Sequence, residues 1–458
     1  MTLRWWRALT MAVALALIAP AVHAAEPDFN PGTSLSQEER AQLQAQYNQL
    51  FAQMLQHPTD LDLMFSFAAV ATRLGNYEAA ISTLERMLLL NPDLPRVKLE
   101  LGELYFHIRS YAVAQSYFQA VVADPHVPAT VKQNAQLYLT QIDKLTSLNH
   151  FAGSITAGFR YQTNANVGPS SNQVVAFGVP AILNSTFVQQ SDWNVFGSTY
   201  LTDSYDILPD KSVTWDTTLQ GYYAYQFTLH ELNLGFAETT TGPRFTLTQQ
   251  PGSELSLRPF VLANAVFLGD SLDFDTFGAG AELDKAFYND RLLLGVGYTY
   301  RYEAFFNSSQ LPTNSLFTGP VNILGVTSSY QLTNTIQLGL SGYASHQLAQ
   351  ADFNANWQYS ISAGISKEYA APFGLTEFPW VATLSAQGIW TNYQSADPTV
   401  DPTTIRADRE FDLTLGNTIG LTRDLSLLLQ AQYTNHNSNI PNFSFTDTSV
   451  VMGTTLSF

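Results

Sequence analysis

Polar and apolar side chains alternate along the last two thirds of this chain, and the alternation continues to its final residue. The last segment reads TSVVMGTTLSF and places Phe458, Leu456, Met452 and Val450 on one face, with Ser457 on the other. Such a segment is a strand with one apolar side, because successive side chains of a strand point to opposite faces. A strand of this kind at the end of a chain must be paired with another strand.

Fourteen segments of this type follow one another from about His150. The apolar face of many of them carries aromatic residues at one or both ends; VTWDTTLQGYYAYQF, for example, sets Trp215, Leu219 and Phe227 on one face. Lipid-facing strands of outer-membrane barrels have this pattern, and single-chain bacterial barrels have an even number of strands. A soluble β-sandwich explains the alternation, but not the aromatic ends, the even number and the terminal phenylalanine together. The strands are expected to start near Phe151, Asp192, Ser212, Leu229, Glu254, Leu272, Asp290, Leu316, Thr335, Asn356, Trp380, Arg409, Leu425 and Thr446.

The connections between these strands differ in length. LPDK, YNDR, LTNT and TRD are tight turns, whereas FNSSQLPTNS, YQSADPTVDPTTI and the long segment after Thr163 are polar or rich in proline. Short turns lie on the periplasmic side of outer-membrane barrels and long loops lie outside. The last strand must pair with the first, because an open sheet edge is not tolerated in hydrocarbon. The face formed by Phe458, Leu456, Met452 and Val450 is also expected to be the signal that barrel-assembly machinery recognises.

The first residues predict export. Arg4 and Arg7 precede a short apolar run, and Val22-His23-Ala24 supplies small residues for cleavage, so residues 1–24 are expected to be a signal peptide. The apolar run is shorter than the roughly 20 residues that a membrane-spanning helix needs, which argues against a retained anchor. The chain has no cysteine, so neither a disulfide nor a lipid at the cleavage site is expected.

The overall charge excludes one class of partner. The formal net charge is -17, and charged residues make up 13% of the chain. Without a cluster of lysine and arginine to neutralise phosphates, nucleic acid is not an expected partner. No later segment reaches 18 consecutive apolar residues, so no membrane-spanning helix is expected either.

Residues 25–148 form the expected helical domain. Several similar residues recur in it at an offset of 34 positions, which is the period of the tetratricopeptide repeat, a helix–turn–helix unit. Leu101-Gly102 and Tyr105 match the first helix of such a unit, although the preceding unit has Phe67-Ala68 where Leu-Gly is usual. A helix from about Pro128 to Ser147 is expected to cap the stack. A simple helical bundle is the alternative, and the matched pairs at one offset favour repeats: Pro58 and Pro92, Tyr77 and Tyr111, Ala80 and Ala114, and Leu84 and Phe118.

The sequence shows no catalytic motif. There is no cysteine nucleophile, HExxH, P-loop or GxSxG, and the histidines have no metal-ligand spacing, so neither an enzyme nor a cofactor is expected. His230-Glu231 and His436 are the residues that could place an acid or base at the outer rim. Four charges are expected to face the barrel lumen, where they either brace the wall through ion pairs or set selectivity: Arg160, Asp216, Arg301 and Glu303.

The order of parts resembles the surface lipoprotein assembly modulator (Slam-type) family, which combines a signal peptide, tetratricopeptide repeats and a barrel of about fourteen strands. The segment GFRYQTNANVGPSS, with Asn164, Asn166 and Gly168, is similar to the opening of that family's barrel. The resemblance implies an outer-membrane protein of a Gram-negative bacterium that helps a client protein to cross the membrane or to be displayed on its outside. The client surface is expected to be bordered by tyrosines of the repeats, namely Tyr77, Tyr105 and Tyr111.

Two other functions fit the same order of parts. Exopolysaccharide export porins also join tetratricopeptide repeats to a barrel, and aromatic and acidic lumen residues suit sugars. A passive porin or structural barrel with a partner-binding periplasmic domain is the third alternative. All three share one expected fold: an α-helical repeat domain over residues 25–148, followed by an antiparallel transmembrane β-barrel over residues 149–458. They also share outer-membrane lipid and the barrel-assembly machinery as partners.

Overall fold

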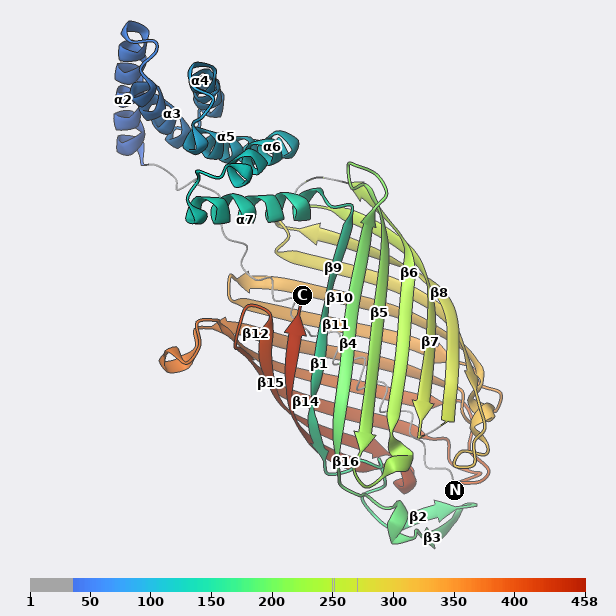
Figure 1. Ribbon diagram of the computed structural model, residues 1–458. Helices are drawn as coiled ribbons and strands as arrows, with labels where there is room; N and C mark the ends of the chain where they lie inside the picture. The colour runs from blue at the N-terminus through green and yellow to red at the C-terminus, as the bar shows by residue number, and fades with distance from the viewer. Residues whose placement is uncertain (1–35, 249, 251, 270) are drawn as a thin grey trace. The chain divides into compact units, whose positions relative to one another are not determined.

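The computed structural model describes residues 36–248, 250, 252–269 and 271–458 (Figure 1). The expected signal peptide, residues 1–24, lies outside the described residues. The described chain divides into two compact units after Leu148, a helical unit and a β-barrel. Each unit is considered by itself below.

The helical unit contains six described helices. Local sequence signals set their ends: the Asp60 carboxylate caps α3 by accepting hydrogen bonds from the backbone N–H groups of Asp62 and Leu63, and Gly75 ends that helix with a φ of 78°. Among the described residues, no helix is long and apolar enough to cross a membrane. The helices are α2 (Gln37–Gln56), α3 (Leu61–Arg73), α4 (Tyr77–Leu90), α5 (Pro95–His107), α6 (Tyr111–Ala123) and α7 (Ala129–Thr146).

The offset of 34 residues corresponds to equivalent positions in two helix pairs, α3–α4 and α5–α6. Ala80 of α4 and Ala114 of α6 are both fully buried, as is Phe118, while Leu84 is almost so. Gly102 of α5 lies directly against the Phe118 ring, where a Cβ atom would come within 2.7 Å of it. Small residues at these positions let the paired helices approach closely, so the helical unit is tetratricopeptide-like, with α7 packed against α6.

The second unit is a closed antiparallel barrel of fourteen strands. Neighbours in sequence are neighbours in the barrel, and β1 closes it by pairing with both β4 and β16. A separate two-stranded hairpin of β2 (Gln173–Ala176) and β3 (Val179–Ile182) lies within the connection between β1 and β4. The barrel strands are β1 (Asn149–Gln162), β4 (Asp192–Asp206), β5 (Val213–Gln226), β6 (Leu234–Thr248), β7 (Leu255–Leu268), β8 (Ser271–Phe287), β9 (Leu292–Phe305), β10 (Gly319–Thr333), β11 (Ile336–Gln347), β12 (Asn356–Tyr369), β13 (Trp380–Tyr393), β14 (Ala407–Gly420), β15 (Leu425–Ser438) and β16 (Phe445–Ser457).

Two strands start later than the sequence pattern predicts. The start expected near Leu229 is at Leu234, because a short 3₁₀ turn over His230–Leu232 precedes β6. The start expected near Leu316 is at Gly319, again after a 3₁₀ turn, Asn314–Phe317. In both cases the apolar residues of the turn look like strand residues in the sequence.

The outward face of the barrel is apolar and bounded by aromatic rings at both ends. On β9, for example, Val296, Tyr298, Tyr300 and Tyr302 point outward and are exposed. An exposed apolar band with two aromatic girdles is the surface that a bilayer covers. Aromatic residues at the end where β1 begins include Phe151, Tyr205, Trp215 and Phe458, and those at the other end include Trp193, Phe227, Tyr302, Trp357, Trp390 and Tyr433.

The two ends of the barrel carry connections of different length, as Figure 1 shows. The end where β1 begins, called the short-turn end below, has turns such as 288–291, 334–335 and 421–424. The opposite, long-loop end has connections such as 163–191 and 394–406. The exceptions to the expected alternation are the long connection 370–379 at the short-turn end and the tight β7–β8 turn at the other.

The last strand closes the barrel in the way that the terminal alternation requires. The Gly153 N–H donates to the Phe458 carbonyl at 2.9 Å, and the Phe458 N–H donates to the Gly153 carbonyl at 3.0 Å. The rings of Phe151 and Phe458 stack with their centroids 5.7 Å apart. Val450, Met452 and Leu456 share the outward face with Phe458, and the end of the chain thereby completes both the sheet and the aromatic girdle.

Candidate functional site

Ion pairs connect neighbouring strands on the inward face of the barrel. The guanidinium of Arg244 on β6 lies 2.6 Å from the Asp216 carboxylate on β5 and 2.7 Å from the Asp284 carboxylate on β8. Asp216 also accepts hydrogen bonds from the hydroxyls of Ser204 and Thr214. One arginine thus joins two acids from different strands, an arrangement that braces the wall.

The other three expected lumen charges also lie on the inward face, but not next to Asp216. Arg160 on β1 donates to the Tyr222 hydroxyl at 2.6 Å. Arg301 and Glu303, both on β9, form a pair at 2.9 Å, with Glu303 almost fully buried. The four predicted charges therefore belong to three separate groups rather than to one site.

A further polar cluster on β14 and β15 was not predicted. Arg406 pairs with Asp408 at 2.8 Å, and His436 Nδ1 lies 2.9 Å from a Glu410 oxygen. His436 lies near the long-loop end of β15, but its side chain is buried, 1% exposed, and stacks on Phe445. The alternation of ADREFDLTL, with Arg409, Phe411, Leu413 and Leu415 outward, was the signal that could have revealed these inward acids.

His230 does lie in a connection at the long-loop end, in the turn that precedes β6. Its Nδ1 is 2.8 Å from the Gln226 carbonyl, and its ring packs against Tyr225. Within the part of the chain that the structure describes, no group of three or more histidines and acids has the geometry to hold a metal ion.

The TNANVG segment organises the first long loop. The Asn164 amide group accepts a hydrogen bond from the Gly168 N–H and donates to the Gly168 carbonyl, both at 2.9 Å. The Asn166 amide group donates to the Val188 carbonyl and accepts from the Gln190 N–H, both at 2.8 Å. These bonds tie the start of the loop to its end, so the two asparagines have a structural role.

The rest of this loop packs on other loops of the long-loop end. The β2 residue Val175 exchanges two hydrogen bonds of 2.8 Å with the side chain of Asn442, and Phe177 and Gly178 donate to the carbonyls of Thr399 and Val400. The hairpin of β2 and β3 lies beyond the strand ends in Figure 1. The loop is therefore held against the connections before β14 and before β16.

The three tyrosines expected to border a client surface pack between helices of the helical unit. Tyr77 stacks on His107, and Tyr111 packs edge-on against Phe106. The Tyr105 hydroxyl donates to Glu85 at 2.6 Å, and this hydrogen bond raises the pKa of Tyr105 to about 12. Tyr77 and Tyr105 pack against one hydrophobic cluster of the helical unit, and Tyr105 and Tyr111 pack against the other.

The first helices of the two repeats share a surface that the sequence did not single out. The guanidinium of Arg96 on α5 lies over the Phe65 ring of α3, 4.8 Å from its centroid. Glu100 and Glu103 follow Arg96 on α5. Burial and the charge of Glu100 raise the pKa of Glu103 to about 7, and burial also raises the pKa of Glu100. Phe65 and Arg96 thus combine an apolar ring with a positive charge, beside two acids whose pKa values are raised by burial.

The comparisons with known proteins concern the fold. No protein-family model and no curated protein sequence matches the chain. The helical part is similar to the type III secretion translocator chaperone SycD of Yersinia enterocolitica, with 16% identity over 23% of this chain and 76% of that one, and a TM-score of 0.21.

The barrel is similar to two solved outer-membrane barrels. A bacterial polysaccharide outer-membrane secretin is 9% identical over 67% of this chain and 98% of its own length, with a TM-score of 0.32. A loop-deletion variant of OmpT from Vibrio cholerae is 8% identical over 68% and 100%, with a TM-score of 0.34. The chain is an outer-membrane-type barrel of fourteen strands preceded by a tetratricopeptide-like helical domain.

Proposed function

We propose that this protein helps client proteins to cross the outer membrane or to be displayed on its outer face, and that it does so without catalysis or a cofactor. The observation that carries the proposal is the direct connection between the two units. Only Ser147 and Leu148 separate the end of α7 from the start of β1. A client held by the helical unit is thereby kept within a short distance of the short-turn end of the barrel, which raises its effective concentration there.

The proposed orientation follows from the connections. The short-turn end, with Phe458, faces the periplasm, and the long-loop end faces outward, as in other barrels of this type. Because β1 begins at the short-turn end, the helical unit is then in the periplasm, where a client arrives after export from the cytoplasm. The expected signal peptide and the resemblance to the Slam-type family support the same orientation.

Client capture is assigned to the surface formed by Phe65, Arg96, Glu100 and Glu103. Stacked helical repeats commonly bind an extended peptide or a helix, with aromatic anchors and charges that select the partner. Tyr77, Tyr105 and Tyr111 hold the helices that carry this surface, and their contribution to the client is therefore indirect.

The test compares the cell surface with and without the gene. Intact native cells are shaved with protease, and the released peptides, the periplasm and the secreted polysaccharide are quantified. Loss of one or a few proteins from the surface together with their accumulation in the periplasm supports export of clients. An unchanged surface proteome with less secreted polysaccharide refutes it in favour of a polysaccharide porin, and no change in either favours a passive barrel.

Site-specific crosslinking tests the capture surface in the same strain. A photoreactive amino acid at position 65 is expected to crosslink to the client, whereas one at position 89 is not. Leu89 is the control because it is 85% exposed and lies on α4, outside the proposed surface of α3 and α5. Equal crosslinking at both positions contradicts the assignment of the surface.

A further inference from the structure

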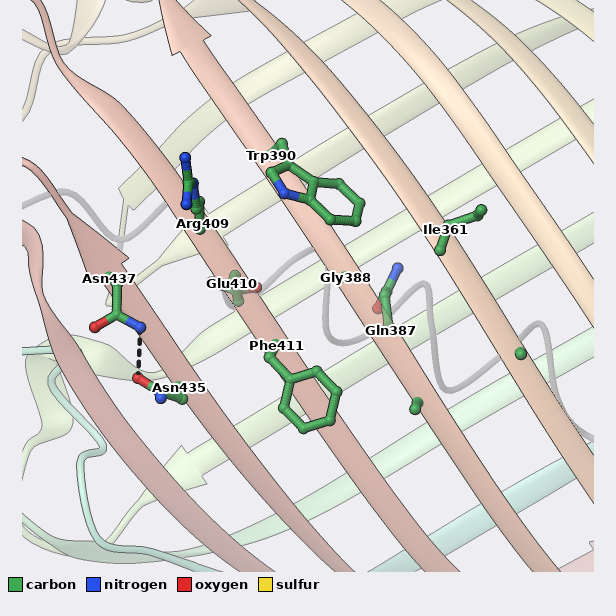
Figure 2. A pocket seen from close by; sticks show the side chains of 11 residues that line it. Ile361, Gln387, Gly388, Trp390, Arg409, Glu410, Phe411, Asn435 and Asn437 are labelled. Atoms are coloured by element: carbon green, nitrogen blue, oxygen red, sulfur yellow. Dashed lines mark hydrogen bonds between the residues drawn. The ribbon is translucent and has the colours of Figure 1, made fainter.

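A groove lies on the outward, lipid-facing side of β12–β15, toward the long-loop end (Figure 2). Its floor is formed by small residues, because Gly388 and Ala386 lie side by side with Ile361 and Ala363 of β12 in the strand register. Phe411 of β14 is the partner of Gly388 on the other side. Ile361 and Phe411 therefore form two apolar walls of an open groove with a volume of about 450 Å³, within the range of small-ligand clefts.

Trp390 lies at the upper end of this groove. A Cβ atom at position 388 would be 2.8 Å from its indole ring, so the ring lies close over Gly388 and depends on the absence of a side chain there. Trp390 belongs to the aromatic girdle of the long-loop end, together with Trp357 and Tyr433. The groove thus begins at the level of the girdle and continues along the apolar band.

Arg409 lies beside Trp390 at the same level of the barrel. Arg409 is the register partner of Trp390 on one side and of Asn437 on the other, and it is the third residue of β14. Its side chain is exposed, and it makes no hydrogen bond or ion pair with the described residues. The Asn437 amide nitrogen donates to Asn435 Oδ1 at 3.1 Å, as Figure 2 shows.

The position of this arginine is unusual within the barrel. In the long-loop half of the described strands, Arg409 is the single arginine or lysine on the outward face; Arg160 and Arg301 point inward there. A lipid-facing arginine without a partner destabilises a barrel, and the loss grows with its depth in the bilayer. A phosphate group at the same level removes that cost, because guanidinium binds phosphate through two parallel hydrogen bonds.

We propose that this groove binds one acyl chain of a multiply acylated lipid with a phosphorylated headgroup, from the leaflet at the long-loop end. The acyl chain lies over Gly388 and Ala386 between Ile361 and Phe411, and a headgroup phosphate pairs with Arg409. The amide of Asn437 adds a donor to the same phosphate. This proposal concerns the outer wall alone and does not depend on the export of clients.

The test measures lipid retention by the purified full-length protein in detergent, with native mass spectrometry. The probes are diphosphorylated lipid A, the same lipid with its phosphates removed, and a neutral diacylglyceryl peptide. The wild-type protein is expected to retain one diphosphorylated lipid, on the order of tenfold more tightly than the dephosphorylated one. Arg409→Gln is expected to abolish that preference.

Matched variants separate the site from the general charge and area of the barrel. Lys367→Gln removes an outward cation of β12 near the short-turn end, outside the groove, and is expected to retain the lipid. Gly388→Leu fills the groove and is expected to weaken retention about tenfold, whereas Ala431→Leu, outward on β15 and away from the groove, is not. Heat-modifiable gel mobility shows whether Gly388→Leu folds. If it does not, Phe411→Ala, which removes a wall of the groove, is used as the test variant instead.

Three outcomes overturn the proposal. Equal retention of phosphorylated and dephosphorylated lipid shows that Arg409 does not select phosphate. If Arg409→Gln and Lys367→Gln lose equal amounts of the diphosphorylated lipid, the lipid is retained by general electrostatic attraction to the barrel. Tighter retention of the neutral diacylglyceryl peptide shows that the occupant is an acylated protein instead of a lipid.

Discussion

Replacing Gly102 by valine tests whether close packing between α5 and α6 stabilises the helical unit. In an exposed helix this change would be slightly favourable, because valine has a higher helix propensity than glycine by roughly 0.3–0.5 kcal/mol. Here the first added atom already lies 2.7 Å from Cε1 and 2.9 Å from Cδ1 of Phe118. The Phe118 ring cannot retreat, since it is fully buried and stacks on Tyr138 with the centroids 4.7 Å apart.

The expected net effect is a loss of stability. Overpacking of a dense core costs about 1–3 kcal/mol, which exceeds the gain in propensity and leaves a destabilisation of about 0.5–2.7 kcal/mol. For a domain of this size, that lowers the melting temperature by roughly 2–15 °C. The assay is circular dichroism at 222 nm on the full-length protein in detergent, where the helical signal reports the unfolding of the helical unit.

Two further variants decide whether the reasoning holds. Ala120→Val, on the exposed side of α6, measures the effect of a β-branched residue alone and is expected to shift the melting temperature only slightly. In the double variant Gly102→Val with Phe118→Leu, the smaller side chain makes room, so the combined loss is expected to be smaller than the sum of the two. A Gly102→Val protein as stable as the wild type refutes the packing argument.

Four other predictions concern charge, loop structure and barrel closure. Because the pKa of Glu103 is about 7 in the folded protein and near 4.5 in the unfolded chain, the contribution of this group to the stability of the helical unit is greatest below pH 4.5 and is lost as the pH rises through 7. Glu103→Gln should raise the stability of the unit at pH 8 by about 1 kcal/mol, after allowance for partial exposure, and should flatten the pH profile of melting between these values; an unchanged profile contradicts this. Arg244→Met leaves Asp216 and Asp284 without their shared cation and should reduce the unfolding free energy of the barrel by about 1–3 kcal/mol, measured by gel mobility in increasing urea. An unchanged unfolding free energy means that the ion pairs do not brace the wall. Asn164→Ala removes the two hydrogen bonds between the Asn164 side chain and the Gly168 backbone, so chymotrypsin should cleave the first long loop at Phe187 faster. Asn172→Ala is the control, because the Asn172 side chain is exposed, and it should leave the cleavage rate unchanged. Deletion of Phe458 removes two closing hydrogen bonds and the stack on Phe151, so the amount of heat-modifiable barrel in the membrane should fall several-fold; Ser457→Ala is the control, and equal yields argue against a role of the terminal residue.

The fold class could be read from the sequence because its two periodicities are local. The alternation of outward residues such as Trp215, Leu219 and Tyr223 follows from the geometry of a single strand in lipid, and most strand starts were accordingly predicted within a few residues. The 34-residue offset likewise follows from the equivalent positions of two helix pairs, so Ala80 and Ala114 were recognised without tertiary information. The late starts of β6 and β10 show the limit, because an apolar 3₁₀ turn and an apolar strand end look alike in sequence.

Partners across strands were decided only by the tertiary structure. Alternation places Asp216 on the inward face, but the register selects Arg244 as its partner, and a shift of one residue would have turned both side chains away. The same register across β13, β14 and β15 buries His436 beside Glu410. It also brings Gly388 and Trp390 next to Phe411 and Arg409 on the outer wall. Sequence alone determines which face of a strand a residue occupies; closure of the barrel determines which residues meet on that face, because register is set jointly by all strands of the ring.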